Sequence, residues 1–272
     1  TVRAPVTLRR IAAFRLVTQQ PELLVAFYAA LGFTISDPHP IGADEMAMLG
    51  IAGVGTRWPM RLGKAAVELD RYAQSGRAYP NGADAASICF QHLALVTDDA
   101  ETAWSRALSA GATLISDAGP VTLPRSSGGV TAVKFRDPEG HPLELLSFPN
   151  ALEKGWGGSG MLGIDHSAIV VSDRAASEAF YTAHGLSRGD ATLNQGSEQA
   201  ALDGLESPVA DVVPMMPAVA PPHVELLHYH RRSGASSEPV AVNDVAATRI
   251  VWHHGPPALL RDPDGHLHQT GG

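Results

Sequence analysis

Three side chains in the first half of the chain are of types that bind divalent metal ions. Glu68, His92 and Glu144 each lie in a mainly apolar segment that should form a strand. Because side chains alternate between the two faces of a strand, Glu144 points away from Leu143 and Leu145. A carboxylate that faces an apolar lining costs several kcal/mol unless it is paired or binds a metal. Two carboxylates beside one imidazole would raise the pKa of at least one carboxyl group, and a divalent ion removes both problems.

One imidazole and two carboxylates form a ligand set that iron or manganese accepts, with coordination positions left for substrate or water. A metal held in this way acts as a Lewis acid and stabilises an enolate or oxyanion as it forms. Glu68 or Glu144 could then act as the general base when it is not tightly coordinated. The alternative is that His92 hydrogen-bonds to a neighbouring carboxylate without any metal.

The strand that carries Glu144 follows a turn that occurs twice in the chain. Asp-Pro-Glu-Gly-His at 137–141 recurs as Asp-Pro-Asp-Gly-His at 262–266. Proline fixes φ and glycine supplies φ > 0, so each copy is typical of a tight turn between two strands. We expect His141 and His266 to hydrogen-bond locally within these turns. The near-copy indicates a duplicated hairpin unit.

The duplication extends to longer modules, each made of a strand, a helix and a run of strands. Apolar residues between positions 23 and 31 recur at three- and four-residue spacing and predict an amphipathic helix. The segment Gln91–Val96 matches Asp165–Val170, which places His92 and His166 at the same point of two modules. Strands are expected, among others, at 11–17, 45–51, 57–62, 65–72, 198–204, 209–216 and 223–230.

A glycine-rich segment at 149–161 is expected to separate two halves, 1–150 and 160–272. The first half would hold modules at about 8–75 and 88–148. The second half would hold a full module at 162–231 and a shortened one at 241–270, which has no room for a helix. The sequence therefore predicts an α+β protein made of two paired-module domains.

The composition limits the partners of the protein. The 272 residues carry a formal net charge of −8 with a pI near 5.8, which argues against binding to nucleic acid or to a membrane surface. The single cysteine, Cys89, excludes an intramolecular disulfide and a multi-cysteine zinc site. No apolar run approaches the ~20 residues of a membrane span, and the N-terminus lacks a signal-peptide core. We therefore expect a cytoplasmic protein with a small-molecule substrate or ligand.

The chain resembles the vicinal oxygen chelate superfamily. Members include glyoxalase I-type lyases, type I extradiol dioxygenases, methylmalonyl-CoA epimerase and antibiotic-binding resistance proteins. The resemblance rests on the motifs within Phe27–Phe33, Gln91–Val96, Phe135–Glu144 and Ile164–Val170. It implies tandem βαβββ modules, the last one truncated, whose curled sheets surround a cleft. The cofactor implied is a divalent metal such as Fe, Mn, Zn or Ni.

The resemblance also implies where the metal ligands lie, with His or Gln on the first strand of a module and Glu on the last. The positions in the first half are Ala13, Glu68, His92 and Glu144, and those in the second half are His166, Glu225, Thr248 and Gln269. Since Ala13 cannot bind a metal, the expected main site is Glu68, His92 and Glu144. A second, weaker site would use His166, Glu225 and Gln269, although a pocket without metal fits that half as well.

Two functions follow from the resemblance. The first is a metal-dependent lyase, isomerase or dioxygenase that acts on a small oxygenated substrate through bidentate chelation. The alternative is a metal-free, resistance-type protein that binds a small molecule, which the alanine at position 13 favours. A homodimer is compatible with either function.

Overall fold

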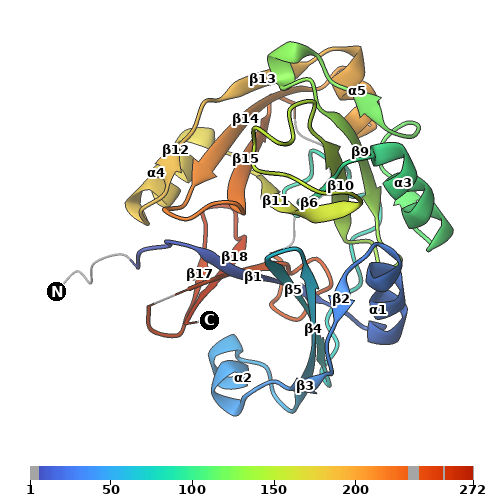
Figure 1. Ribbon diagram of the computed structural model, residues 1–272. Coiled ribbons are helices and arrows are strands. Elements are labelled where there is room, and N and C mark those ends of the chain that lie inside the picture. The colour runs from blue at the N-terminus through green and yellow to red at the C-terminus, as the bar shows by residue number, and fades with distance from the viewer. Residues whose placement is uncertain (1–5, 232–238, 254, 272) are drawn as a thin grey trace.

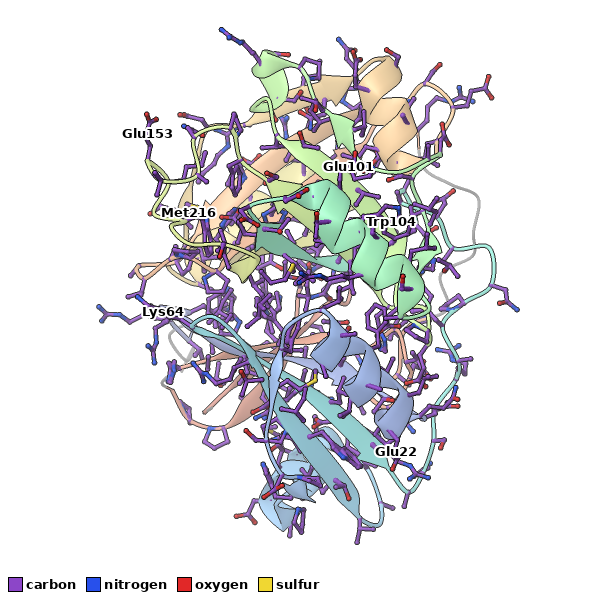
Figure 2. All side chains as sticks on the ribbon, turned by 45° about the vertical axis from the view of Figure 1, so that its right-hand side comes forward. Glu22, Lys64, Glu101, Trp104, Glu153 and Met216 are labelled. Atoms are coloured by element: carbon purple, nitrogen blue, oxygen red, sulfur yellow. The ribbon has the colours of Figure 1, made fainter. Side chains whose placement is uncertain are left out.

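The computed structural model describes residues 6–231, 239–253 and 255–271. Its strands form two sheets, which lie in the lower and the upper half of the molecule in Figure 1. The α-helices are α1 (Pro21–Ala30), α2 (Ala43–Leu49), α3 (Ala100–Ser109), α4 (Arg174–Ala183) and α5 (Ser197–Asp203). Helices α1 and α3 pack side by side on one side of the molecule (Figure 2).

The lower sheet has eight strands. Its order is β17 (Ala258–Arg261), β18 (Leu267–Thr270), β16 (Arg249–Trp252), β1 (Ile11–Val17), β5 (Ala65–Tyr72), β4 (Gly55–Leu62) and β2 (Thr34–Ile35), with β3 (His39–Pro40) also paired to β4. These strands belong to the first and the fourth module. The fourth module has three strands and no helix among its described residues, as its shortened sequence predicts.

The upper sheet has ten strands and contains the second and the third module. Its order is β12 (Ser187–Arg188), β14 (Val209–Met216), β15 (His223–Tyr229), β11 (Met161–Val170), β6 (Gln91–Thr97), β10 (Pro142–Ser147), β9 (Thr131–Arg136) and β7 (Thr113–Leu114). Two further strands, β13 (Thr192–Gln195) and β8 (Val121–Thr122), pair with β14 and β9. The α+β class and the βαβββ modules agree with the prediction from the sequence.

The sheets do not follow the predicted halves 1–150 and 160–272. The first strands of the modules pair antiparallel, β1 with β16 and β6 with β11, so each sheet takes one module from either half. The second module pairs with the third, across the expected boundary at 149–161, and the first module pairs with the fourth.

The duplicated turn has the local hydrogen bonds that the sequence predicts. His141 Nδ1 lies 2.8 Å from Asp137 Oδ2, and His266 Nδ1 lies 3.0 Å from Asp262 Oδ2. The other ring nitrogen of His141 lies 2.9 Å from the Val17 carbonyl oxygen at the end of β1. The histidine therefore ties its turn to a strand of the other sheet.

The turn aspartates connect the first module to the second and the third module to the fourth. The Tyr28 hydroxyl of α1 donates to Asp137 of the second module over 3.0 Å. The Tyr181 hydroxyl of α4 donates to Asp262 of the fourth module over 3.2 Å. Each predicted half is thus held together by a helix-to-turn contact between its two modules.

Two segments predicted as strands, 45–51 and 198–204, form the short helices α2 and α5. In α2 the buried side chains Met46 and Leu49 are three residues apart and lie on one helical face. Glycine residues border both helices, and Gly50 and Gly204 end them with φ of 67° and 61°. In segments this short, apolar residues three apart do not distinguish a helix from an interrupted strand. The prediction of strands at 45–51 and 198–204 was wrong for this reason.

Alternation along β6 separates the apolar core from the candidate site. Leu93 and Leu95 belong with Trp104 of α3 to the largest apolar cluster, which also includes Phe14 of the lower sheet. His92 is the residue before Leu93 and therefore points to the opposite face of β6. No helix of the described residues is long and apolar enough to cross a membrane.

Candidate metal centre

Four side chains of the metal-binding types come together on the upper sheet. They are His92, Glu144, His166 and Glu225, which lie on β6, β10, β11 and β15. These four strands are neighbours in the order β15-β11-β6-β10. The second and third modules contribute one histidine and one glutamate each, so the site has approximate twofold symmetry.

The distances between the ligand atoms suit one metal ion. Glu144 Oε2 lies 3.0 Å from His92 Nε2 and 4.0 Å from His166 Nε2, and Glu225 Oε2 lies 3.4 Å from His166 Nε2. Metal bonds to nitrogen and carboxylate oxygen are about 2.1 Å long, so neighbouring ligands lie roughly 3.0–3.4 Å apart in octahedral or tetrahedral geometry. Donor atoms of His92, Glu144 and His166 all lie within 4.8 Å of one another.

An unpaired ring nitrogen supports the fit to a metal. His166 Nε2 is buried and has no hydrogen-bond partner in the structure, although it faces two carboxylates. An orphaned buried polar atom is rare in folded proteins and needs an explanation. A metal bond at Nε2 would satisfy it.

Asp165 orients His166, and the sequence reasoning did not identify it. Its Oδ2 lies 2.9 Å from His166 Nδ1, so Nδ1 donates to this carboxylate and Nε2 faces the cluster, where it would bind an ion after losing its proton. Adjacent residues of a regular strand point to opposite faces, but the β11 register advances two residues, from Ile164 to His166, against one on β6. Asp165 is therefore the extra residue of a β-bulge, which turns its side chain toward its neighbour.

The charges of the cluster are set by burial and by neighbouring groups. Burial lowers the pKa of His92 to about 4 in spite of Glu144, so this imidazole is neutral near pH 7. Burial opposes ionisation of Glu144, but His92 and Lys134 outweigh it and lower the pKa of this carboxyl group to about 2. Burial also opposes protonation of His166, but Glu225 and Asp165 raise its pKa to about 9. The cluster thus attracts positive charge, which a divalent cation supplies.

The four residues line a cavity of about 500 Å³. Its remaining walls are mostly apolar and come from both modules, with Leu123 and Leu146 on one side and Val212 and Met216 on the other. A cavity of this size accommodates a small organic molecule beside the cluster.

The predicted ligand Glu68 lies elsewhere. It is on β5 of the lower sheet, where its Oε2 lies 2.6 Å from Arg15 Nε and 3.4 Å from Arg57 Nε. Helix α2 adds Glu45, which accepts hydrogen bonds from Arg15 over 2.6 Å and from Arg57 over 2.8 Å. The guanidinium groups of Arg15 and Arg57 therefore lie where a metal ion between these carboxylates would have to bind. Glu68 does not line the cavity of the upper sheet.

Gln269 of the second predicted set also lies in the lower sheet. Its Nε2 donates to Glu45 Oε1 over 3.1 Å. The structure thus splits both predicted sets, and it unites His92 and Glu144 of one with His166 and Glu225 of the other. The matching of Gln91–Val96 to Asp165–Val170 was the signal that could have grouped the two histidines, His92 and His166.

Paired βαβββ modules with two histidines and two glutamates on adjacent strands are typical of a class of small-molecule metalloproteins. The model of the Glyoxalase/Bleomycin resistance protein/Dioxygenase superfamily matches residues 10–145, half of the chain. The chain therefore belongs to this superfamily. No curated protein sequence matches it.

The solved structures that share its fold include the following two. Glyoxalase I from Zea mays is 14% identical, with a TM-score of 0.62, and the match covers 96% of this chain and 92% of that chain. A proposed dioxygenase from Bacillus subtilis is 10% identical, with a TM-score of 0.60 and coverage of 97% and 85%. At sequence identities this low, the similarity shows a shared fold only.

Proposed function

We propose that the protein is a metal-dependent enzyme of this superfamily that acts on a small oxygenated substrate. The observation that carries the proposal is the convergence of the donor atoms of His92, Glu144 and His166, with Glu225 beside His166 and with His166 Nε2 buried and without a hydrogen-bond partner. A divalent ion bound there would supply Lewis-acid chemistry to two neighbouring oxygens of the substrate.

The protein side chains have separate tasks in this proposal. His92 and His166 would bind the ion through Nε2, and Asp165 holds the proton of His166 on Nδ1. Glu225 is better suited than Glu144 to take a proton from the substrate, because its side chain is 18% exposed against 7% and it contacts only His166 in the cluster. Glu68, which the sequence suggested as a base, is paired with two arginines and does not reach the cavity.

Metal binding by the purified protein tests the proposal. The metal-free protein, prepared with a chelator, would be titrated with Fe²⁺, Mn²⁺, Co²⁺, Ni²⁺ and Zn²⁺ by calorimetry. We expect one ion per chain, and at least a hundredfold weaker binding in His166→Ala and Glu144→Ala. Glu68→Gln is the matched control and should bind as the wild type does, because it removes a carboxylate of the lower sheet.

The opposite result has a defined meaning. If no ion of the series binds to the wild type, the enzyme proposal fails. The cavity would then belong to a metal-free binding protein, with the hydrogen bond between His92 and Glu144 closing the cluster internally.

A further inference from the structure

We propose, on the basis of the function proposed above, that the cavity selects an uncharged and mainly apolar substrate. In this proposal the only anionic part of the bound molecule is the pair of oxygens at the metal. Substrates with a further carboxylate or phosphate would be rejected.

Apolar side chains form most of the cavity walls beyond the ligands, and strand alternation places several of them there. On β10, Leu146 follows Glu144 by two residues and shares its face, and on β15 Leu227 follows Glu225 in the same way. Across the cavity Val212 and Met216 of β14 extend this surface. A substrate that extends away from the metal ligands along these strands therefore contacts mostly hydrocarbon.

The buried cation of the cavity, Lys134, is already neutralised. It is the cross-strand partner of Glu144 on β9, and only 3% of its surface is exposed. Its Nζ lies 2.6 Å from Asp203 Oδ1 of α5. The other oxygen, Asp203 Oδ2, accepts hydrogen bonds from Gln199 over 2.8 Å and from Tyr229 over 2.9 Å. These contacts hold Asp203 against Lys134, so the ammonium group is not free to bind a substrate anion.

Apart from Lys134, the described lining has no buried lysine or arginine that could pair with a second anion. Glu144 and Glu225 would balance a divalent ion, and Asp165 is paired with His166. Lys154 is exposed at the rim, with its Nζ 5.1 Å from the centre of the Phe148 ring. Among the described residues no arginine lines the cavity. An anionic group on the apolar wall would be desolvated without a counter-charge, which is unfavourable.

A pair of matched chelators tests this inference. Maltol and comenic acid both present a hydroxyl group next to a ketone on a pyranone ring, but comenic acid carries an additional carboxylate. Each would be titrated into the Co²⁺-loaded protein while its absorption spectrum is recorded, and each affinity would be divided by that of the same chelator for free Co²⁺. We expect this normalised affinity to be at least tenfold higher for maltol. Equal or tighter binding of comenic acid overturns the inference.

A variant tests the role of the buried ion pair. Asp203→Asn removes the charge that neutralises Lys134, so we expect it to improve the binding of comenic acid relative to maltol by at least threefold. Asp44→Asn is the matched control, because it also removes one carboxylate charge but lies at an exposed position of α2, outside the cavity. An unchanged ratio in a folded Asp203→Asn protein contradicts this role of Lys134. If this variant does not fold, the wild-type comparison still decides the inference.

The two proposals fail in different ways. If the protein binds Co²⁺ and both chelators but prefers comenic acid, the metal-dependent function stands and the inference about substrate charge is wrong. If the wild type binds no metal ion, the proposed function fails and the inference fails with it.

Discussion

At the scale of single residues, Asp165 shows how the proposed metal site would depend on a side chain that does not bind the metal. His166 has two ring nitrogens, and the hydrogen bond of 2.9 Å from Nδ1 to Asp165 decides which of them faces the cluster. Sequence reasoning identified His166 from its place in the repeat. It could not identify Asp165, because a regular strand would point this carboxylate to the opposite face and only the bulge reverses it.

The first prediction concerns this hydrogen bond. Asp165→Ala should weaken metal binding ten- to a hundredfold, about the usual effect of losing such a partner. Asp165→Asn should bind nearly as the wild type does, because its amide oxygen still accepts from Nδ1. Calorimetric titration with Co²⁺ measures both, and Asp190→Ala controls for the loss of a carboxylate from the lining. Equal affinities in wild type and Asp165→Ala would show that Asp165 does not orient the ligand.

A second prediction at this scale concerns acid stability and Glu45. Burial favours the protonated acid, but Arg57 and Arg15 outweigh it and lower the pKa of Glu45 to about 2. The folded-state pKa is thus below the unfolded value of about 4.3. Ionised Glu45 therefore stabilises the fold above pH 4.3, and this contribution is lost as the pH falls toward 2.

The variant Glu45→Gln isolates this contribution. We expect it to lower the free energy of unfolding at pH 7 by about 2 kcal/mol and to differ little from wild type near pH 2. Urea unfolding at several pH values between 2 and 7 measures both effects. Asp44→Asn removes an exposed carboxylate of the same helix and serves as the control. A constant difference between wild type and Glu45→Gln at all pH values would contradict the assignment.

At the scale of elements, the short helices α2 and α5 have parallel roles in the two sheets. Helix α2 brings Glu45 to Arg15 and Arg57 in the lower sheet, and α5 brings Asp203 to Lys134 in the upper sheet. Neither helix was predicted, because each is only seven residues long. Longer elements such as α1 and the strands β14 and β15 lie close to their predicted places, because their apolar periodicity extends over more residues.

The ion pair between α5 and β9 gives a third prediction. Asp203→Ala leaves the buried ammonium group of Lys134 unpaired and should lower the free energy of unfolding by about 3–5 kcal/mol. The double variant Lys134→Met with Asp203→Ala removes both charges and should recover most of this loss. Urea denaturation of wild type, both single variants and the double variant gives the coupling energy. A coupling near zero would mean that the two groups act independently.

At the scale of the whole molecule, the sequence predicts the modules but not how they pair. The repeated turns and the matching strand motifs identify four modules and the shortened fourth one. Local sequence carries no signal for which first strands meet, so the halves 1–150 and 160–272 were proposed from chain order alone. The pairing of β6 with β11 brings together His92 and His166, and it therefore decides which ligands share a site.

The contacts between consecutive modules give a fourth prediction. Tyr28→Phe and Tyr181→Phe each remove a buried hydrogen bond to a turn aspartate and should lower the free energy of unfolding by about 1–2 kcal/mol. Metal affinity should stay unchanged, because neither tyrosine lines the cavity. Urea unfolding and Co²⁺ titration measure the two quantities, with Thr182→Ala at an exposed position of α4 as the control. A loss of metal affinity in either variant would show that the sheets and the site are coupled.

The arginine cluster of the lower sheet has a consequence for how this sheet depends on ions. Its carboxylates are held by Arg15 and Arg57, so the lower sheet needs no inorganic ion to balance these charges. A chelating agent that strips ions from the protein should therefore leave the packing of this sheet as it is.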